Sequence, residues 1–304
     1  MKRLKRLYQI PRKGLSFAFD NCPTDWLSDK QYLKIKYRLR MGKRLDLQHP
    51  KTLNEKLQWL KLHNRRPEYT MMVDKYAVRS YIAEQLGEEY LIPLLGVWDH
   101  PEDIGFDELP NRFVLKCNHN SGLGMCICRD KSRLNIPQVR RGLEQGLKQD
   151  YYLHGREWPY KNVPRKILAE QYMTDTPATD EFTDYKFYCF GDYVDCVLVC
   201  VERSSGDPKF YFFDQNWCLK RYNKRGKAAP ADFTLPKPPN MDRMFEIAKE
   251  LSIKTKAPFV RVDLYNSNGQ IYFGELTFFP DSGFDPNRLP ETDLYFGDLV
   301  QLNS

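Results

Sequence analysis

The residues best suited to chemistry lie in two strand-like stretches between residues 260 and 276, VRVDLYNS and QIYFGEL, joined by a turn signal. With a three-residue loop at residues 267–269, Asp263 pairs with Phe273. Glu275 then shares a face with Asp263, as a diagonal neighbour about 7–8 Å away. A two-residue loop would instead put the two carboxylates on opposite faces, so the prediction depends on the loop.

Two carboxylates at this separation can bind one or two Mg²⁺ ions, which prefer oxygen ligands. Arg261 precedes Asp263 by two residues and should point to the same side. A cation beside metal-binding carboxylates can hold a phosphate group or a developing oxyanion. Taken alone, however, the pattern favours an ordinary hairpin with surface charges.

A second candidate is the segment FVLKCNHNSGLGM, residues 113–125, in which Lys116 ends a strand and a Gly/Ser/Asn loop follows. Glycines allow backbone N–H groups to approach phosphate oxygens, and a lysine adds a positive charge. The Gly-Lys-Ser/Thr end of a Walker A motif is missing. A plain glycine-containing hairpin loop is the alternative.

A third candidate is KILAEQYM, residues 166–173, where Glu170 follows an apolar strand. Such a strand edge can offer backbone N–H and C=O groups to an adenine ring. A connecting strand with one exposed acid is the alternative interpretation. Lys186, in DYKFYCF, supplies a further cation within a strand.

The elements that must position these residues are of two kinds. Apolar spacing predicts helices at residues 51–64 and 75–86, the second capped by Asp74 and ended by Gly87. Helices are also expected after Pro137 and over residues 241–251. The remainder is rich in aromatic and branched residues with turn signals, which indicates strands, antiparallel ones prominently in the second half. The predicted fold class is α+β.

The composition is that of a globular protein, with 41% hydrophobic and 29% charged residues. No apolar run is long enough to span a bilayer and no secretory signal pattern is present, so we expect a cytoplasmic protein. The eight cysteines should then be reduced packing residues, with a zinc site around residues 117–128 as a weaker alternative.

Charge is concentrated at the start of the chain, because residues 1–50 contain 13 Lys and Arg against 4 Asp and Glu. A solvated helix surface is the favoured interpretation. Peripheral association with an anionic membrane surface or a polyanionic glycan is the minority alternative. No nucleic-acid-binding module accompanies these residues, so no nucleic acid partner is expected.

The order of these motifs resembles that of the ATP-grasp superfamily. Lys75 in VDKYAVR is similar to the first phosphate-binding lysine and Lys116 to the second, which precedes the flexible phosphate loop. The segment RVDLYNSNGQIYFGELT resembles the closing motif R-x-D, hairpin, E-x-N, with Thr277 where the family has asparagine.

The resemblance implies the ATP-grasp fold, in which two α+β lobes clasp ATP, and it implies ATP and Mg²⁺ as cofactors. Arg261 and Lys116 are the expected catalytic residues. The expected metal ligands are Asp263, Glu275 and Thr277. The expected nucleotide-binding residues are Lys75, Lys116, Asn120, Ser121, Gly122, Gly124, Glu170, Gln171, Tyr172, Met173 and Lys186.

A narrower resemblance covers most of the chain. LNEKLQWLKLHNRRP, VDKYAVR, FVLKCNHNSG, DYKFYCF and GELTFFPDSGF are together similar to the TupA-like, teichuronopeptide-biosynthesis branch of ATP-grasp proteins. It implies an N-terminal helical region at residues 1–110, a small lobe at 111–170 and a large lobe at 171–304.

The same branch implies a carboxylate–amine ligase that forms an amide through an acyl phosphate. The expected partners are a carboxylate-bearing sugar or glycan of a bacterial surface polysaccharide and a small amine or amino acid. The alternatives are an ATP-grasp kinase, a glycosyltransferase, or a non-catalytic glycan-binding protein that uses the aromatic-rich strands near Tyr211 and Trp217. His119 is a weaker candidate for proton transfer.

Overall fold

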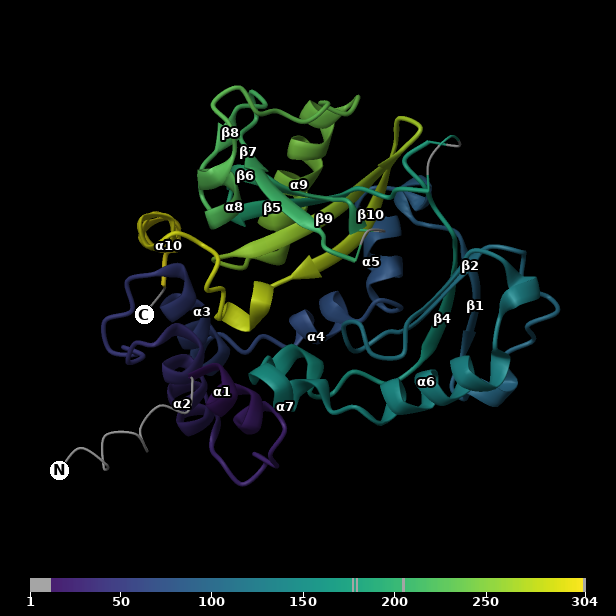
Figure 1. Ribbon diagram of the computed structural model, residues 1–304, viewed down its shortest axis with the longest axis horizontal. Coiled ribbons are helices and arrows are strands. Elements are labelled where there is room, and N and C mark those ends of the chain that lie inside the picture. Colours follow the sequence, from purple (N-terminus) through teal and green to yellow (C-terminus); the bar gives the residue numbers. More distant parts are fainter. Residues whose placement is uncertain (1–11, 177, 179, 204–205, 303–304) are drawn as a thin grey trace, which may run out of the picture. The chain divides into compact units, whose positions relative to one another are not determined.

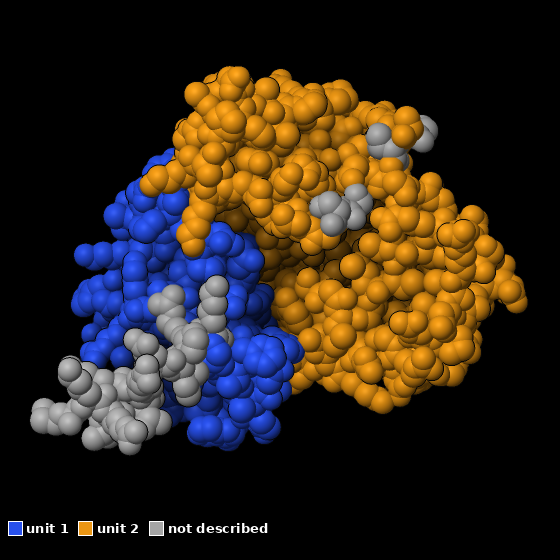
Figure 2. Space-filling view, viewed as in Figure 1, with its two compact units in different colours: residues 1–65, 152–158, 279–304 blue, residues 66–151, 159–278 orange. Residues whose placement is uncertain are grey.

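The computed structural model divides the chain into two compact units, which Figure 2 colours separately. The described residues are 12–176, 178, 180–203 and 206–302, so the basic stretch MKRLKRLYQIP, on which part of the surface-association expectation depends, lies outside them. Unit 1 comprises residues 1–65, 152–158 and 279–304, and unit 2 comprises residues 66–151 and 159–278.

Unit 1 is helical. Two of its helices begin with capping boxes, in which Ser28 pairs with Gln31 and Thr52 pairs with Glu55, so backbone N–H groups at both starts are satisfied locally. Tyr32, Leu33 and Tyr37, from the helix that Ser28 caps, pack with Phe284 in the core of the unit. The helices are α1 (Arg12–Asp20), α2 (Asp29–Met41), α3 (Leu53–His63), α7 (Tyr151–Gly155) and α10 (Pro290–Leu299).

Unit 2 contains two antiparallel sheets (Figure 1). The smaller has the strand order β1-β4-β2-β3. Its strands are β1 (Leu94–Trp98), β2 (Phe113–Cys117), β3 (Cys126–Cys128) and β4 (Ile167–Gln171). The larger has the order β10-β9-β5-β6-β7-β8. Its strands are β5 (Asp184–Phe190), β6 (Tyr193–Val201), β7 (Lys209–Phe213), β8 (Leu219–Lys220), β9 (Val260–Ser267) and β10 (Gln270–Thr277).

Each sheet of unit 2 buries one face under a helix. Helix α9 packs against β5, β6 and β9, and Phe245 of α9 meets Phe187 of β5 edge to face at 4.9 Å between ring centroids. Helix α6 packs against β2. The helices of unit 2 are α4 (Glu68–Val73), α5 (Val78–Gln85), α6 (Ile136–Lys148), α8 (Lys224–Ala228) and α9 (Met241–Thr255).

Most predicted elements are confirmed, with two corrections of boundary. Pro137 lies in the first turn of α6, as predicted. Helix α5 begins at Val78, not at residue 75, because Asp74 accepts the N–H groups of Tyr76 and Ala77 and so caps a separate turn. Helix α9 continues to Thr255, four residues beyond the predicted end.

The boundaries of the three predicted segments, at residues 1–110, 111–170 and 171–304, stay a prediction. The structure shows, however, that two stretches of the chain associate with parts outside their predicted segments. Strand β1, which lies within the predicted N-terminal segment of residues 1–110, pairs with β4 some 70 residues later in the chain. Residues 279–304, from the predicted large lobe, belong to unit 1. No described helix combines the length and the apolar character required to cross a bilayer.

Candidate active site

A cavity of about 570 Å³ lies within unit 2 and is lined by both of its sheets. The surface of this unit is visibly hollowed in Figure 2. The cavity brings together most residues singled out in the sequence: Lys75, Lys116, Asn120, Ser121, Gly122, Glu170, Gln171, Tyr172, Met173, Lys186, Arg261, Asp263 and Glu275.

Strand alternation explains which side chains of the small sheet reach the cavity. On β2, Phe113 and Leu115 are buried in the core beneath α6, whereas Val114 and Lys116 point the opposite way and line the cavity. Glu170 is paired with Val114 across β2 and β4 and reaches the same side. One face of this sheet therefore provides packing and the other provides the site.

The hairpin of β9 and β10 has a different register from the predicted one. Its loop contains only two residues, Asn268 and Gly269, since Ser267 pairs with Gln270. The prediction of a three-residue loop, with Asp263 opposite Phe273, is wrong.

Asp263 nevertheless shares a side with Glu275, because a β-bulge between Phe273 and Glu275 shifts the register and sets the two acids directly opposite each other. Glycine is needed at position 274 in the bulge. A Cβ there would lie 2.9 Å from the carbonyl oxygen of Asp263 and 2.9 Å from the ring of Tyr265.

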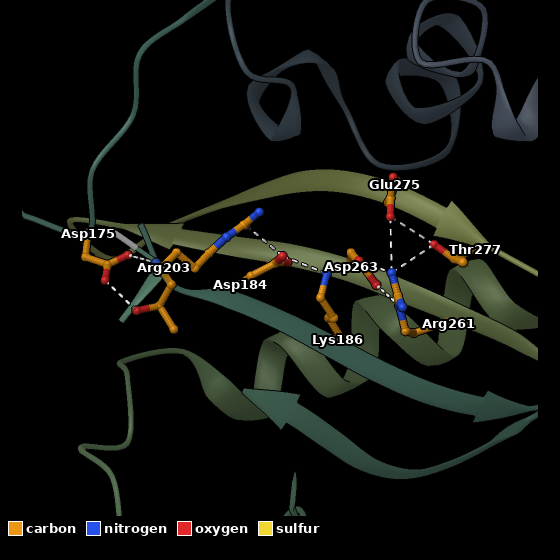
Figure 3. A network of polar contacts seen from close by, with 9 residues as sticks. Asp175, Asp184, Lys186, Arg203, Arg261, Asp263, Glu275 and Thr277 are labelled. Carbon is orange, nitrogen blue, oxygen red and sulfur yellow. Dashed lines mark hydrogen bonds and ion pairs between the residues drawn. The ribbon is translucent and has the colours of Figure 1, made fainter. Parts of the chain in front are cut away.

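Three neighbouring strands form a row of charges across the large sheet (Figure 3). Lys186 of β5 is opposite Asp263 of β9, which is opposite Glu275 of β10. The Lys186 ammonium lies 2.5 Å from Asp263 Oδ2. Arg261 donates to both oxygens of Asp263 at 2.6 and 2.7 Å and to Glu275 Oε1 at 3.1 Å. The fork of Arg261 thus joins the two carboxylates.

Burial opposes these contacts, and the balance shifts the pKa values of the two carboxylates in opposite directions. Burial raises the pKa of Asp263 to about 6, although Arg261 and Lys186 favour its ionised form. Burial also disfavours ionisation of Glu275, but Lys75, Arg261 and Lys186 outweigh it and lower the pKa of Glu275 to about 2. Glu275, with 37% of its side chain exposed, is therefore ionised and open to the cavity at neutral pH.

Two lysines face the cavity from the side of the small sheet. Lys116 donates to Glu170 Oε2 at 2.5 Å, and Arg79 lies 3.6 Å from the other oxygen of this carboxylate. Lys75 donates to the backbone carbonyl of Asn120 at 2.6 Å. Burial, with a contribution from the nearby charge of Lys116, lowers the pKa of Lys75. Of the two lysines, Lys116 is thus held by a carboxylate, that of Glu170, and Lys75 by a backbone carbonyl.

The two glycines of the loop that follows β2 differ in their surroundings: Gly122 has free space around it, whereas Gly124 is tightly packed. Gly122 has φ +85°, and a Cβ there would meet nothing within 4 Å. Gly124, with φ +73°, lies against α6, where a Cβ would be 3.0 Å from the Cα of Gly146. Gly124 is not among the residues that line the cavity, so its visible role is to anchor the loop.

The segment predicted as an adenine hinge is partly engaged by the protein itself. The N–H of Gln171 donates to the carbonyl of Pro93 at 3.0 Å. The guanidinium of Arg112 lies over the ring of Tyr172 at 4.1 Å, and Arg129 donates to the Tyr172 hydroxyl at 3.2 Å. Met173 lines the cavity.

Thr277 lies beside the cavity without lining it. Its hydroxyl donates to Glu275 Oε1 at 3.0 Å and accepts from Arg261 at 3.1 Å. The hydroxyl oxygen of Thr277 is thus adjacent to Glu275, a predicted metal ligand, and to Arg261.

Sequence reasoning missed Asp184 and Arg203, which also line the cavity. Asp184 Oδ2 contacts Lys186 at 2.6 Å and Arg203 at 2.9 Å, whereas the buried Oδ1 has no hydrogen-bond partner among the described residues. The sequence does contain a signal for Asp184, because it precedes Lys186 by two residues on one strand, as Arg261 precedes Asp263. Residues two apart on a strand point to the same face of the sheet.

The weaker candidates have packing roles. His119 is buried, its Nε2 lies 3.1 Å from the carbonyl of Gln149, and it does not line the cavity. Trp217 stacks on Phe213 at 4.6 Å, and Tyr211 packs against Phe233. Cys117 and Cys128 lie in the apolar core of the small sheet. Across the described ranges, no group of three or more His, Cys, Asp or Glu side chains suited to a metal occurs.

Comparison with solved structures gives distant similarities. D-alanine–D-alanine ligase from Bacillus anthracis, complexed with ATP, has 15% identity and a TM-score of 0.45 over 76% of this chain and 63% of that one. The enzyme of the same name from Helicobacter pylori has 14% identity and a TM-score of 0.43 over 82% and 69%. L-amino acid ligase from Bacillus licheniformis has 15% identity and a TM-score of 0.40 over 76% and 49%. This chain thus spans less than two thirds of the first of these proteins.

Sequence comparison gives a more specific result. No curated protein matches. The model of the family described as TupA-like ATPgrasp matches residues 55–301, a range that contains every residue lining the cavity. The predicted α+β class with the ATP-grasp fold is confirmed. The chain belongs to the TupA-like ATP-grasp family.

Proposed function

We propose that this protein is an ATP-dependent carboxylate–amine ligase that forms an amide through an acyl phosphate. One observation carries the proposal. Lys75 and Lys116 line the same cavity as Arg261, Asp263 and Glu275, so cations and oxygen ligands from the two sheets surround one space. Membership of an ATP-grasp family supports ATP as the nucleotide.

The side chains present are compatible with a magnesium–nucleotide complex. Asp263, Glu275 and Thr277 offer oxygen atoms on adjacent strands, the ligand type that Mg²⁺ prefers. Asp184 Oδ1, which has no hydrogen-bond partner in the described part of the chain, is a buried acceptor at the cavity, available to a donor on a bound ligand. When bound, Mg²⁺ would neutralise phosphate charge.

The charge of each residue in the cavity would determine its role in binding ATP. Lys75 and Lys116 would hold phosphate oxygens, with Ser121 and Gly122 of the loop nearby. Positioning and charge neutralisation supply most of the acceleration in phosphoryl transfer. Glu170 would keep Lys116 oriented through the contact described above.

In the reaction, a substrate carboxylate oxygen bonds to the terminal phosphorus of ATP, the bond from that phosphorus to ADP breaks, and an acyl phosphate results. The nitrogen of the amine then bonds to the acyl carbon, and inorganic phosphate leaves with its bridging oxygen. The amine loses a proton to solvent. Arg261 would stabilise the oxyanion that develops at the acyl carbon.

For the substrate we propose a uronic-acid carboxylate on a bacterial surface polysaccharide or its precursor, and a small amine or amino acid, with the enzyme acting in the cytoplasm. The family supports this choice through the resemblance described above. An ATP-grasp kinase would use the same cationic cavity and is the closest rival. The packing of Tyr211 and Trp217 gives no support to a glycan-binding platform there.

The experiment is an incubation of the purified protein with ATP, Mg²⁺, glucuronate-type acceptors and a panel of amines. Release of inorganic phosphate together with an amide product supports the ligase. A phosphorylated sugar would establish the kinase, and consumption of a nucleotide sugar with ATP intact would establish a glycosyltransferase. Glycan binding that survives Glu275→Ala and needs no ATP would point to a non-catalytic protein.

A further inference from the structure

One face of helix α2 in unit 1 carries three cations that the proposed reaction does not use. Lys30, Lys34 and Arg38 are spaced four residues apart, so their side chains lie along one face of the helix. All three are exposed, and no ion pair joins them to a carboxylate in the described ranges. Like charges at this spacing destabilise a helix slightly, and an anionic partner would relieve that repulsion.

Two acids beside α2 are paired with other cations. Asp29 lies 2.5 Å from Arg65, and Asp20 lies 3.1 Å from Lys36. Neither acid is therefore paired with Lys30, Lys34 or Arg38.

Exposed apolar side chains accompany these cations. Trp26, just before α2, is 76% exposed, and its indole N–H donates to the carbonyl of Pro23 at 3.0 Å. Its neighbour Leu27 is buried in the core of unit 1, so the tryptophan is held outward. Ile35, which lies three residues before Arg38 on α2, is 40% exposed, and Phe17 on the adjoining α1 is 71% exposed.

We propose that the α2 face, meaning Lys30, Lys34 and Arg38 together with Trp26 and Ile35, docks the protein onto a membrane surface of anionic lipids. The cations would contact lipid phosphates, and the two apolar side chains would enter the boundary between headgroups and acyl chains. A polyanionic glycan or a nucleic acid would engage the cations but leave Ile35 in water. A membrane accounts for both kinds of side chain.

The test is co-sedimentation of the full chain with vesicles of phosphatidylcholine alone or with 30% phosphatidylglycerol added. Binding should require the anionic lipid and weaken at 1 M salt, where the Debye length falls to about 3 Å. The variant Lys30→Gln/Lys34→Gln/Arg38→Gln should lower the partition coefficient on the order of 100-fold. Trp26→Ser should lower it roughly tenfold.

Matched controls remove the same charge or an exposed aromatic ring from unit 2. Lys224→Gln/Lys227→Gln/Lys249→Gln and Tyr193→Ser should retain vesicle binding, and every variant should retain ligase activity on soluble substrates. Equal loss in the control triple, full binding by the α2 triple, or tight binding to heparin with none to vesicles would each overturn the proposal. Activity without vesicle binding would leave the ligase intact and reject this surface alone.

Discussion

The two units bury their charged side chains in different ways. In unit 1, the fully buried Lys61 donates to Gln58 Oε1 at 3.0 Å and to the carbonyls of Gly155 and Ser282 at 2.7 Å each. Three donors meet three acceptors, and the ammonium also lies 4.8 Å from the ring centroid of Phe284. Nothing in this arrangement is left over for a ligand.

In unit 2, the charged groups lie on the cavity faces of two sheets and satisfy one another only in part. Asp263 is shared between Arg261 and Lys186, whereas one oxygen of Asp184 has no partner among the residues that the structure describes. A buried charge alone therefore does not identify a site. The distinguishing feature is a set of charges that opposes a second element across an accessible space.

The sharpest test of this contrast is Glu275→Gln, which removes a carboxylate of the cavity but keeps its shape. We expect ligase activity to fall about 10²–10³-fold, the cost typical of losing one preorganised charged group. Because its lowered pKa means that ionised Glu275 also stabilises the fold at neutral pH, denaturant unfolding should shift to a lower concentration, and activity is measured where both proteins are folded. Phosphate release and amide yield measure the effect, with Glu144→Gln on α6 as a control. Activity within threefold of the wild type would remove Glu275 from the proposed site.

The converse test is Lys61→Met in unit 1. It removes the donor to the Gly155 carbonyl and to the Gln58 amide oxygen, and leaves the Ser282 carbonyl with Gln58 Nε2 as its donor. The free energy of unfolding should therefore fall by about 3 kcal/mol. Denaturant titration measures this, and Lys51→Met at an exposed position should change it by less than about 0.5 kcal/mol. Stability equal to the wild type would show that the three contacts of Lys61 contribute no net stabilisation.

A pair of glycines in α6 tests the packed side of the small sheet. A Cβ at Gly146 would lie 2.8 Å from the Cα of Gly124, whereas one at Gly142 would meet nothing within 4 Å. Gly146→Ala should therefore destabilise the protein by about 1–3 kcal/mol and displace the phosphate loop. Gly142→Ala should stabilise it by about 0.5–1 kcal/mol through helix propensity. Thermal unfolding of both variants decides the matter, and equal shifts would contradict the proposed contact.

The smallest effect concerns Lys75 and pH. Because burial lowers its pKa, the ammonium loses its charge at a lower pH than an exposed lysine would. Affinity for Mg-ATP should thus weaken as pH rises toward 10, by up to about tenfold. Lys75→Arg should retain its affinity over the same range, since arginine stays charged. Calorimetry from pH 7 to 10 measures both, and parallel profiles would exclude titration of Lys75 as the cause.

Local patterns in the sequence located much of the site, but not all of its members. Spacing of two residues along a strand placed Arg261 and Asp263 on one side, and the structure confirms it. The same rule applied to DYKF would have found Asp184. Arg203 lies outside the quoted motifs, and Arg79, although it ends VDKYAVR, meets Glu170 through the tertiary structure alone, so neither gave a comparable signal.

The sequence by itself determined the strands, their alternation and the presence of a hairpin with two acids, because these depend on neighbours within a few residues. Only the tertiary structure decided that β1 joins β4 and that the acids face each other. The second outcome depends on the bulge before Glu275. The bulge occurs at Gly274 because a residue without a Cβ leaves room there for the carbonyl oxygen of Asp263 on the neighbouring strand. The residue pattern of a single strand does not reveal this contact between strands.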